Sequence, residues 1–388
     1  MIKRAATSRI MYIAGIHPVI TVAGPRYAGK TTLVKKLFQR HGYVDLEMPD
    51  ILEFARTSPF EFLKYHMRSG GLVIDEYLRA PELMSHIRAA VKSVRQPGRF
   101  VLVTSRLPQA QYSIARPPLR YPATQILLPL TIEELRRVKF DLSRDEYIYR
   151  GFMPRVYCGK EIGPGHIYRN YLTDFIDRDA IYGPGNRIAF AHFMIGIARR
   201  IGQIINLATI AKEAGVSISV AVAWLSTLEA GFIIFRLPPY PKLIGKRTTK
   251  IPKFYFTDVG MAAFLLKIKS SDQVFRDPLS GNLFENMVVA DAQKHCCNIG
   301  GMTRLSYYRD QNRLEVDLIL DKRSSIVPIE IKSNTVFSPS FADSIVEFQK
   351  LSRKAANGNI VYGGKTQKRF GEPQYTNFKD MGKIVRGW

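Results

Sequence analysis

The sequence predicts an α/β protein with several domains, and three observations lead to this fold class. Residues 1–135 alternate apolar runs with helical patterns, which is typical of a parallel sheet covered by helices. A glycine-rich loop joins the first of these runs to a helix, and near the end of the chain two apolar runs flank a short polar turn. With 388 residues, the chain is long enough for two or three such domains.

The first domain is predicted to cover residues 1–135. Its candidate strands are the apolar runs at 19–23, 43–46, 72–74, 100–104 and 125–128. The glycine-rich loop Gly24–Thr31 directly follows the first run and fits GxxxxGK[ST], the phosphate-binding P-loop. Glycine allows backbone N–H groups to converge on phosphate oxygens, and the start of a helix favours an anion. A chance match in a glycine turn is the alternative interpretation.

The P-loop interpretation predicts a site for ATP and Mg²⁺. Lys30 would reach the β- and γ-phosphates, and Thr31 would ligate Mg²⁺. The residues expected to bind the nucleotide are Gly24, Pro25, Arg26, Tyr27, Ala28, Gly29, Lys30, Thr31 and Thr32.

Two acids end the apolar run at 72–74 and give a second phosphate-site signal. Asp75 and Glu76 would lie at the carboxyl edge of the sheet, where ligands bind in open α/β folds. Asp75 would hold Mg²⁺ through water, and Glu76 would orient or deprotonate the attacking water. Thr104 and Ser105 end the next strand, where hydroxyl groups either contact the γ-phosphate or water, or form a turn.

Residues 136–200 are predicted to form a helical connector, broken by glycine and proline. Arg178 lies in this connector between two aspartates. Its side chain would either act as an arginine finger toward a neighbouring subunit or pair with the flanking acids.

Residues 201–268 are predicted to form a winged helix. Asn206 can cap a helix that Gly215 ends, and a second helix covers 220–230. Strand-like runs at 232–235 and 254–256 then bracket a wing that suits a phosphate backbone. The basic residues of this wing are Arg236, Lys242, Lys246, Arg247, Lys250 and Lys253. The second helix is rich in alanine and valine, so it predicts no sequence-specific readout of bases; packing within or between subunits is the alternative.

Residues 269–388 are predicted to form an α/β domain of the PD-(D/E)xK nuclease-like type. Runs at 314–320 and 326–332 form a hairpin, which places Asp317 beside Glu330 and Lys332. The two carboxylates suit Mg²⁺, and the lysine can polarise water or stabilise the developing charge. Glu285 is the one acid on a mainly apolar helix predicted upstream at residues 281–289. Exposed hairpins also pair Glu with Lys, which is the structural alternative.

Composition supports an anionic partner. Lys and Arg number 57 against 33 Asp and Glu, and the formal net charge is +24. Such a charge attracts nucleic acid, with DNA as the expected form, although a generally basic proteome is the alternative. Three cysteines without paired spacing indicate neither a disulfide framework nor a zinc site. We expect a cytoplasmic protein without a membrane span, and the sequence leaves a homo-oligomer open.

The residues described so far resemble a prokaryotic family of AAA-type P-loop ATPases. In that family a C-terminal domain of unknown function combines a winged helix with a PD-(D/E)xK nuclease-like fold. The resemblance is carried by GPRYAGKTT, VIDEYLRAPEL, LPLTIEEL, LEAGFIIFRLPPY, KFYFTDVG, GNLFEN, EVDLIL and IEIK. It implies nucleotide and Mg²⁺ roles for Lys30, Thr31, Asp75 and Glu76. It maps Glu285, Asp317, Glu330 and Lys332 onto the nuclease-like core, with Glu285, Asp317 and Glu330 as its metal ligands.

Two functions are compatible with these patterns. The first is an ATP-hydrolysing, DNA-binding enzyme whose C-terminal domain cuts DNA with Mg²⁺. The second is a nucleotide-gated regulatory switch that binds DNA or a protein partner without cleavage. The intact set of two acids and a lysine favours the enzyme.

Overall fold

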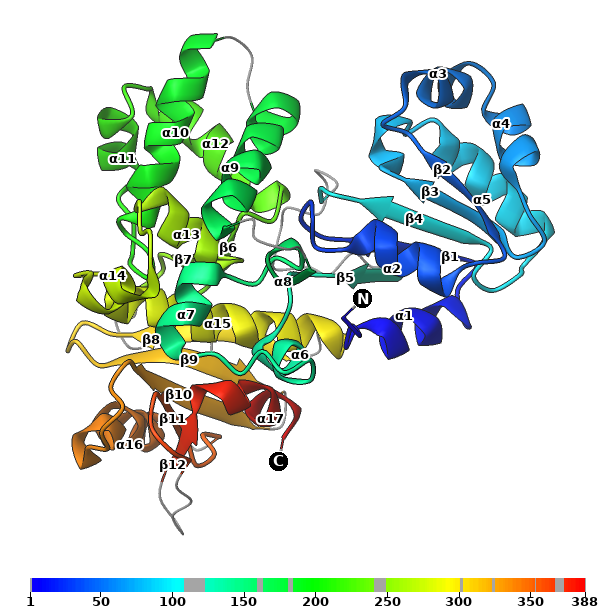
Figure 1. Cartoon of the computed structure of the whole chain (residues 1–388). Helices are drawn as coiled ribbons and strands as arrows, with labels where there is room; N and C mark the ends of the chain where they lie inside the picture. Colours follow the sequence, from blue (N-terminus) through cyan, green and yellow to red (C-terminus); the bar gives the residue numbers. More distant parts are fainter. Residues whose placement is uncertain are drawn as a thin grey trace. The chain divides into compact units, whose positions relative to one another are not determined.

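The computed structural model describes residues 2–107, 123–158, 163–180, 184–240, 249–300, 303–322, 325–352, 354–366 and 373–387. The chain forms two compact units, each assembled from separate stretches of sequence (Figure 1). Unit 1 comprises Met1–Pro129, Ala230–Phe232 and Cys297–Gly300. Unit 2 comprises Leu130–Glu229, Ile233–Cys296 and Gly301–Trp388. The boundaries of the four predicted domains stay predictions.

Unit 1 contains a five-stranded parallel sheet in the order β2-β3-β4-β1-β5. The strands are β1 (Val19–Ala23), β2 (His41–Asp45), β3 (Gly71–Asp75), β4 (Phe100–Thr104) and β5 (Ala123–Ile126). β1, β3 and β4 are buried at every position, as expected for the centre of a sheet covered on both faces. The predicted α/β fold with a P-loop sheet is therefore confirmed.

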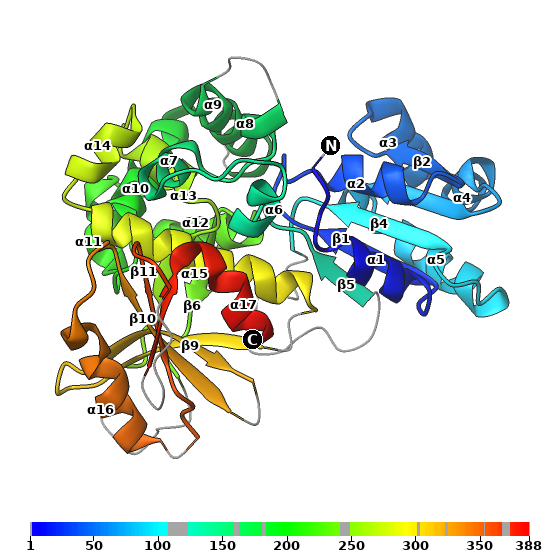
Figure 2. The same cartoon turned by 60° about the horizontal axis from the view of Figure 1, so that its bottom comes forward.

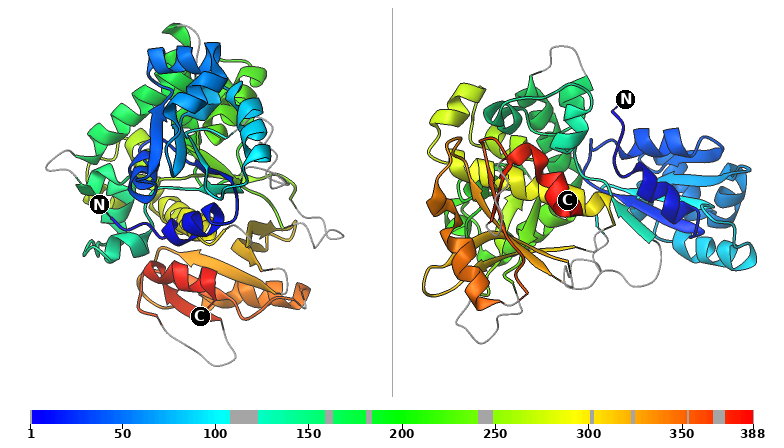
Figure 3. Two further views of the ribbon diagram at one scale, coloured as in Figure 1. Left: turned by 90° about the vertical axis from the view of Figure 1, so that its right-hand side faces the viewer. Right: turned by 90° about the horizontal axis from the view of Figure 1, so that it is seen from below.

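Helices cover both faces of this sheet because successive strand side chains point to opposite sides. On one face Ile20 and Val101 pack against α1 (Thr7–Ala14) and α2 (Lys30–Leu37). On the other face lie α3 (Pro49–Thr57), α4 (Pro59–His66) and α5 (Leu83–Ser93), as Figure 3 shows. A short 3₁₀ turn, η1 (Tyr77–Arg79), follows the acids after β3.

Two short stretches from later in the chain complete unit 1. The Leu107 N–H donates to the carbonyl of Ala230 at 3.0 Å. The amide of Gln125 donates to the carbonyl of Cys297 at 2.8 Å. Phe232 packs with Ala23 in a small apolar cluster. The sheet of unit 1 thus depends on residues that follow it by more than a hundred positions.

The first part of unit 2 is helical, as predicted for residues 136–200. Its helices are α6 (Ile132–Arg136), α7 (Arg144–Arg150), α8 (Arg155–Cys158), α9 (Pro164–Phe175) and α10 (Pro184–Ala198), with a π-helical turn, η3 (Ile176–Ala180), after α9. Capping boxes begin α6 and α7, in which Thr131 and Ser143 exchange hydrogen bonds with a glutamate three positions on.

The next elements are α11 (Leu207–Glu213), α12 (Ile218–Ala230), β6 (Ile234–Leu237) and β7 (Lys253–Phe256). Asn206 caps α11, and Gly215 has the expected positive φ of 70°. The two helices meet at 102°, within the range for a helix-turn-helix. β6 begins at Ile234 instead of the predicted Phe232 because Phe232 has φ 59° and does not extend the strand. Together these segments give the order expected of a helix pair followed by a hairpin.

A mixed five-stranded sheet forms the remainder of unit 2, in the order β12-β11-β10-β9-β8. Its strands are β8 (Arg304–Arg309), β9 (Glu315–Asp321), β10 (Ile326–Lys332), β11 (Asn359–Tyr362) and β12 (Gln374–Asn377). β9 and β10 form the predicted antiparallel hairpin, in which Ile329 pairs with Leu318. β10, β11 and β12 are parallel.

Helices lie on both sides of this second sheet. They are α15 (Ser280–Asn298), α16 (Asp343–Leu351) and α17 (Met381–Arg386), with 3₁₀ turns η5 (Pro339–Ala342) and η6 (Phe378–Asp380). α13 (Val259–Leu265) and α14 (Ser271–Arg276) contact α7 instead. α16 covers one face, where Phe348 packs against Val316 and Ile326. α15 runs along the other side, with α17 beside it (Figure 2).

Within the described parts of the chain, we find no single helix with the length and apolar character to cross a membrane. α11 and α12 reach the required length and composition only as a pair, bent at their junction.

Candidate functional site

The P-loop of unit 1 is a tightly packed turn between β1 and α2. A Cβ atom on Gly24 would lie 2.0 Å from the carbonyl oxygen of Leu127, so only glycine fits there. Gly29 precedes α2 with φ 89°, and Tyr27 also has a positive φ of 61°. This backbone turns back on itself before the helix, as a phosphate-binding loop requires.

Lys30 is held inside this loop. Its Nζ donates to the carbonyl oxygens of Gly24 at 2.8 Å and Pro25 at 2.9 Å, and the residue is 6% exposed. Burial lowers the pKa of Lys30 to about 8, although the nearby Glu76 and Asp75 oppose the shift. A phosphate group would offer this buried ammonium a better partner than the loop's own carbonyls.

Thr31 and Asp75 lie together at the mouth of the P-loop. The Thr31 hydroxyl donates to Asp75 Oδ2 at 2.6 Å, and Tyr43 donates to the same oxygen at 3.0 Å. A hydroxyl and a carboxylate are hard oxygen ligands, and Mg²⁺ needs only one or two carboxylates when phosphates and water supply the rest. The predicted Thr31 and Asp75 pair therefore fits a Mg²⁺ ion bound together with a nucleotide.

Glu76 is the other acid of the predicted pair. It adopts φ 53°, and its Oε2 accepts hydrogen bonds from the N–H of Ser105 at 3.1 Å and its hydroxyl at 3.0 Å. Burial raises the pKa of Glu76, whereas the Lys30 charge and the Ser105 N–H oppose the shift. By contrast, the Thr104 hydroxyl bonds with the backbone of Arg106, as in a turn. Of the two hydroxyls at this strand end, Ser105 faces the nucleotide-site acid.

Arg4 supports the P-loop from the N-terminal segment, and no sequence pattern predicts this contact. This arginine is 6% exposed, and its guanidinium donates to the carbonyls of Ala28 at 2.7 Å and Leu128 at 2.6 Å. In the loop itself, Arg26 pairs with Glu47 at 2.7 Å, while the Thr32 side chain is exposed. Arg4 thus ties the loop backbone at Ala28 to the backbone at Leu128.

The predicted acids of unit 2 meet in one cavity of about 580 Å³. Asp317 comes from β9, Glu330 and Lys332 come from β10, and Glu285 comes from α15. Asp317 Oδ2 accepts a hydrogen bond from the N–H of Ile331 at 2.8 Å, which locks it beside β10. The predicted alternation along the hairpin therefore brings Asp317, Glu330 and Lys332 together, and α15 adds Glu285.

Each carboxylate in this cavity already has a partner. Glu330 accepts hydrogen bonds from Lys332 Nζ at 2.5 Å and from the Ser344 hydroxyl at 2.6 Å. Burial and the nearby Asp317 raise the pKa of Glu330 to about 7. Burial also raises the pKa of Asp317. The rise in these pKa values shows that the cavity holds more negative charge than its buried surroundings favour.

A second lysine, Lys253 of β7, completes the cavity. Its side chain is 4% exposed, and its Nζ lies 3.2 Å from Glu285 Oε1 and 2.6 Å from Glu315 Oε1. Tyr255 donates to the same Glu285 oxygen at 2.6 Å. Burial and the Asp317 charge raise the pKa of Glu285 to about 7, and the acids around Lys253 raise its own pKa against the effect of burial.

These contacts determine which metal the cavity suits. Among the described residues, no three His, Cys, Asp or Glu side chains are placed to hold a metal ion together. Asp317 and Glu330 nevertheless supply two carboxylates at adjoining strands. The donor set fits a Mg²⁺ ion that takes its other ligands from phosphate and water, and it does not fit an ion enclosed by protein alone.

The basic wing predicted for residues 236–253 is only partly available to a ligand. Arg236 pairs with the buried Glu229 at 2.6 Å, and Lys253 belongs to the acidic cavity. Lys250 is exposed. The other predicted wing cations, Lys242, Lys246 and Arg247, lie outside the described residues. In the predicted connector, Arg178 has an interaction partner, and we assign no function to its side chain.

The sheet, the P-loop and the acids after β3 together define unit 1 as a P-loop ATPase. A model of the AAA domain matches residues 16–136, which makes this segment an AAA-type ATPase domain. Two models described as domains of unknown function match the rest: DUF8612 at residues 142–272 and DUF4143 at residues 280–381.

Relatives of the whole chain are found in mycobacteria. Uncharacterized proteins of Mycobacterium bovis and Mycobacterium tuberculosis are each 27% identical over 370 residues, covering 94% of this chain and 80% of the relative. Among solved structures, a Walker-type ATPase of Pyrococcus abyssi has 12% identity and a TM-score of 0.42, covering 69% of this chain and 96% of that one. The RuvB Holliday junction branch migration motor of Thermotoga maritima has 16% identity and a TM-score of 0.28, with coverages of 61% and 90%.

Proposed function

We propose that the chain is a Mg²⁺-dependent ATPase that binds DNA and cuts it at the acidic cavity of unit 2. The observation that carries the cleavage part is the convergence of Glu285, Asp317, Glu330 and Lys332 in one cavity from three separate elements. The net charge of +24 supports an anionic polymer as the partner.

At the nucleotide site, Lys30 is the phosphate ligand because its ammonium is buried among loop carbonyls. Thr31 and Asp75 are the residues that would hold Mg²⁺, which neutralises phosphate charge when bound. Glu76 is the residue that orients the attacking water, and Ser105 fixes the direction of its carboxylate. These positions support the predicted catalytic roles of Lys30 and Glu76.

At the acidic cavity, Asp317 and Glu330 are the residues that would hold Mg²⁺, with Glu285 behind them. A bound Mg²⁺ supplies charge neutralisation at a phosphodiester. Lys332 lies within 2.5 Å of Glu330 and can donate to a phosphate oxygen or to water. Lys253 opposes the rise in the pKa of Glu285 by direct contact.

DNA binding is proposed through the helix pair and hairpin of unit 2. α11 and α12 meet at 102° and precede the two-stranded sheet of β6 and β7, which is the order of a winged helix. The exposed face of α12 carries Ile218 and Val222, side chains that make no hydrogen bonds to base edges. Binding is therefore proposed to be independent of sequence.

Separate variants test the two activities. ATP hydrolysis should be lost in Lys30→Ala and kept in Lys36→Ala, an exposed lysine of the same helix. Cleavage of linear and branched DNA should need Mg²⁺ and disappear in Asp317→Asn and Lys332→Ala while ATP hydrolysis is retained. Equal ATP turnover in wild type and Lys30→Ala contradicts the assigned nucleotide site. DNA cleavage that survives both cavity variants means that the cleavage site lies elsewhere.

A second function has specific support from Lys253. Because this buried ammonium lies between Glu285 and Glu315, it already balances part of the charge that a metal would balance. The alternative is a nucleotide-gated switch that binds DNA or a protein partner without cutting. It predicts slow ATP hydrolysis, ATP-dependent binding, and no DNA cleavage with Mg²⁺ or Mn²⁺.

A further inference from the structure

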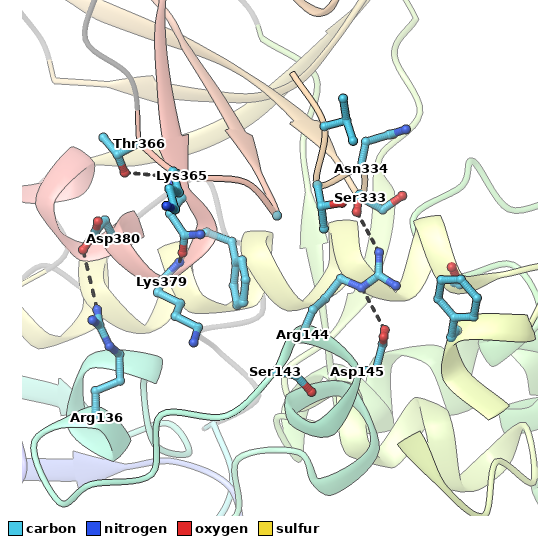
Figure 4. A pocket seen from close by; sticks show the side chains of 17 residues that line it. Arg136, Ser143, Arg144, Asp145, Ser333, Asn334, Lys365, Thr366, Lys379 and Asp380 are labelled. Carbon is cyan, nitrogen blue, oxygen red and sulfur yellow. Dashed lines mark hydrogen bonds and ion pairs between the residues drawn. The ribbon is translucent and has the colours of Figure 1, made fainter. Parts of the chain in front are cut away.

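A second cavity of unit 2, larger than the acidic one, has about 860 Å³ of volume (Figure 4). It is lined by four basic side chains, two acids, several hydroxyl and amide groups and two phenylalanines. The basic residues are Arg136, Arg144, Lys365 and Lys379, and the acids are Asp145 and Asp380. This volume is typical of sites that enclose a ligand of small-molecule size, roughly 300–1,000 Å³. It is too small for a duplex and suits one or a few unpaired nucleotides.

The cations reach the cavity from different parts of the chain. Figure 4 shows Lys365 and Lys379 on one side and Arg144 beneath Ser333 on the other. Arg144 has a structural contact, because it donates to the Ser333 carbonyl at 2.7 Å and pairs with Asp145 at 2.8 Å. Arg144 uses two of its five N–H donors in these contacts, which fix this part of the cavity wall.

The other cations are held less tightly. Arg136 lies 3.4 Å from Asp141 and 3.6 Å from Asp380, which are long ion pairs at a side chain that is 40% exposed. Lys379 pairs at 2.7 Å with Asp141, an acid that is itself 57% exposed. Exposed pairs of this kind contribute little and exchange readily for a phosphate. Lys365 is exposed, and no ion pair of its ammonium is found among the described residues.

The two aromatic side chains differ in their surroundings. Phe378 is 3% exposed and packs edge-on against Phe284 at 5.6 Å, so it belongs to the core. Phe275, at the end of α14, is 69% exposed although it is a large apolar ring. An exposed ring and several cations that line one cavity are the combination with which proteins stack unpaired bases while binding the backbone phosphates.

The two cavities of unit 2 adjoin each other along the chain. β10 ends with Lys332 in the acidic cavity, and Ser333 lines the basic one. α15 begins with Ser280 in the basic cavity, and Asn282 lines the acidic one. The two cavities therefore share β10 and α15 as elements of their walls.

From these observations we infer that the basic cavity binds a single-stranded segment of nucleic acid next to the acidic cavity. Lys365, Lys379 and Arg136 contact its phosphates, and Phe275 stacks on a base. This assignment rests on the proposed binding of DNA and narrows it to unpaired nucleotides. On this inference, the DNA that reaches Asp317 and Glu330 is branched or frayed and is not an intact duplex.

Fluorescence anisotropy with a labelled single-stranded oligonucleotide, in EDTA and without nucleotide, tests the inference. We expect Lys365→Ala/Lys379→Ala to weaken binding about tenfold and to reduce the salt dependence, with a slope change of roughly 0.7 for each lost phosphate contact. Phe275→Ala should weaken binding about fivefold or more, the effect of losing one base stack, and Phe275→Tyr should restore it.

Lys350→Ala is the matched control, because this lysine of α16 is 63% exposed and lines neither cavity. Cross-linking of a bromodeoxyuridine oligonucleotide to the wild-type protein gives a result that does not depend on any variant. Cross-links in the peptides around Phe275 or residues 333–336 support the site, and cross-links confined to the wing contradict it.

The outcomes separate this inference from the proposed function. If the wild type binds single strands and every variant binds equally well, the cavity assignment is wrong while DNA binding stands. If the double variant weakens duplex and single-strand binding equally, the preference for unpaired nucleotides is wrong. If the wild type binds neither form, DNA binding and the cavity assignment fail together.

Discussion

At the scale of single residues, the direction of the Glu76 side chain is the least expected feature of the nucleotide site. Its carboxylate points to Ser105 and accepts two hydrogen bonds there. Hydrogen bonds donated to a carboxylate favour its ionised form, which is the form that a general base needs. With Glu76 in its proposed role, Ser105 would act on catalysis through Glu76, as a positioning residue.

Replacing this serine tests the interpretation. In Ser105→Ala the backbone N–H still donates to Glu76 but the hydroxyl does not, so the pKa of Glu76 should rise further. The acidic limb of the pH–rate profile for ATP hydrolysis should move to higher pH, by roughly one unit for the loss of one hydrogen bond to a charged group. Thr104→Val, which alters the neighbouring turn, should leave the pH profile in place. An unchanged pH–rate profile in Ser105→Ala would mean that the serine has only a structural role.

The acids of unit 2 give a prediction about pH and stability. The pKa values of Glu285 and Glu330 are about 7 in the folded protein against an ordinary 4.5. The folded state therefore binds more protons than the unfolded state between these values. Their contribution to the free energy of unfolding is fully present below pH 4.5 and is lost as the pH rises through 7.

Thermal or urea unfolding of the wild type and of Glu285→Gln/Glu330→Gln, in EDTA, measures this contribution. The amide variant should be more stable than the wild type at pH 8 by about 2 kcal/mol, and the difference should shrink toward pH 5. Taking the difference between the two proteins removes titrations that both share. A difference that is constant with pH contradicts the raised pKa values.

At the scale of elements, the P-loop depends on a contact from outside its own strand and helix. Arg4 donates to the carbonyls of Ala28 and Leu128, and Arg4→Met would leave both buried acceptors without these donors. We expect Arg4→Met to weaken ATP binding about tenfold and to destabilise unit 1 by roughly 1–3 kcal/mol. Lys3→Ala, next to it and exposed, is the control. Equal ATP affinity in wild type and Arg4→Met would show that Arg4 does not support the nucleotide site.

Much of each element could be predicted from local sequence. β1 and β4 have the predicted limits because their apolar runs end in a glycine loop or in hydroxyl residues. The acids of the β9–β10 hairpin were brought together by strand alternation, which fixes the face of each side chain. α15 is longer than the segment that the sequence indicated, because its interior mixes apolar and polar residues without a clear stripe.

Contacts between distant segments could not be predicted in the same way. Lys253 appeared in the sequence as a wing cation, and its partners Glu285 and Glu315 belong to other elements. No periodicity links a strand of one hairpin with a helix and a strand that follow much later. The same holds for Arg4 beneath the P-loop and for the basic cavity, whose lining comes from several loops.

At the scale of the whole molecule, the proposed function requires the nucleotide state to govern DNA binding. We expect Glu76→Gln, which should bind ATP without hydrolysing it, to have at least a fivefold different affinity for DNA in ATP and in ADP. By reciprocity, DNA should change the affinity for ATP by the same factor. Anisotropy titrations in both directions check this. Identical DNA affinities with ATP, ADP and no nucleotide would leave the two activities uncoupled.

The discontinuous sequence of unit 1 has a consequence for any attempt to divide the protein. A fragment that stops near residue 135 would lack Ala230–Phe232 and Cys297–Gly300, and the N–H of Leu107 and the amide of Gln125 would lose their carbonyl partners. No single proteolytic cut can release an intact ATPase, since the chain returns to it twice. We therefore expect ATPase activity to be expressed and purified only with the whole chain, and to be lost when the chain is divided.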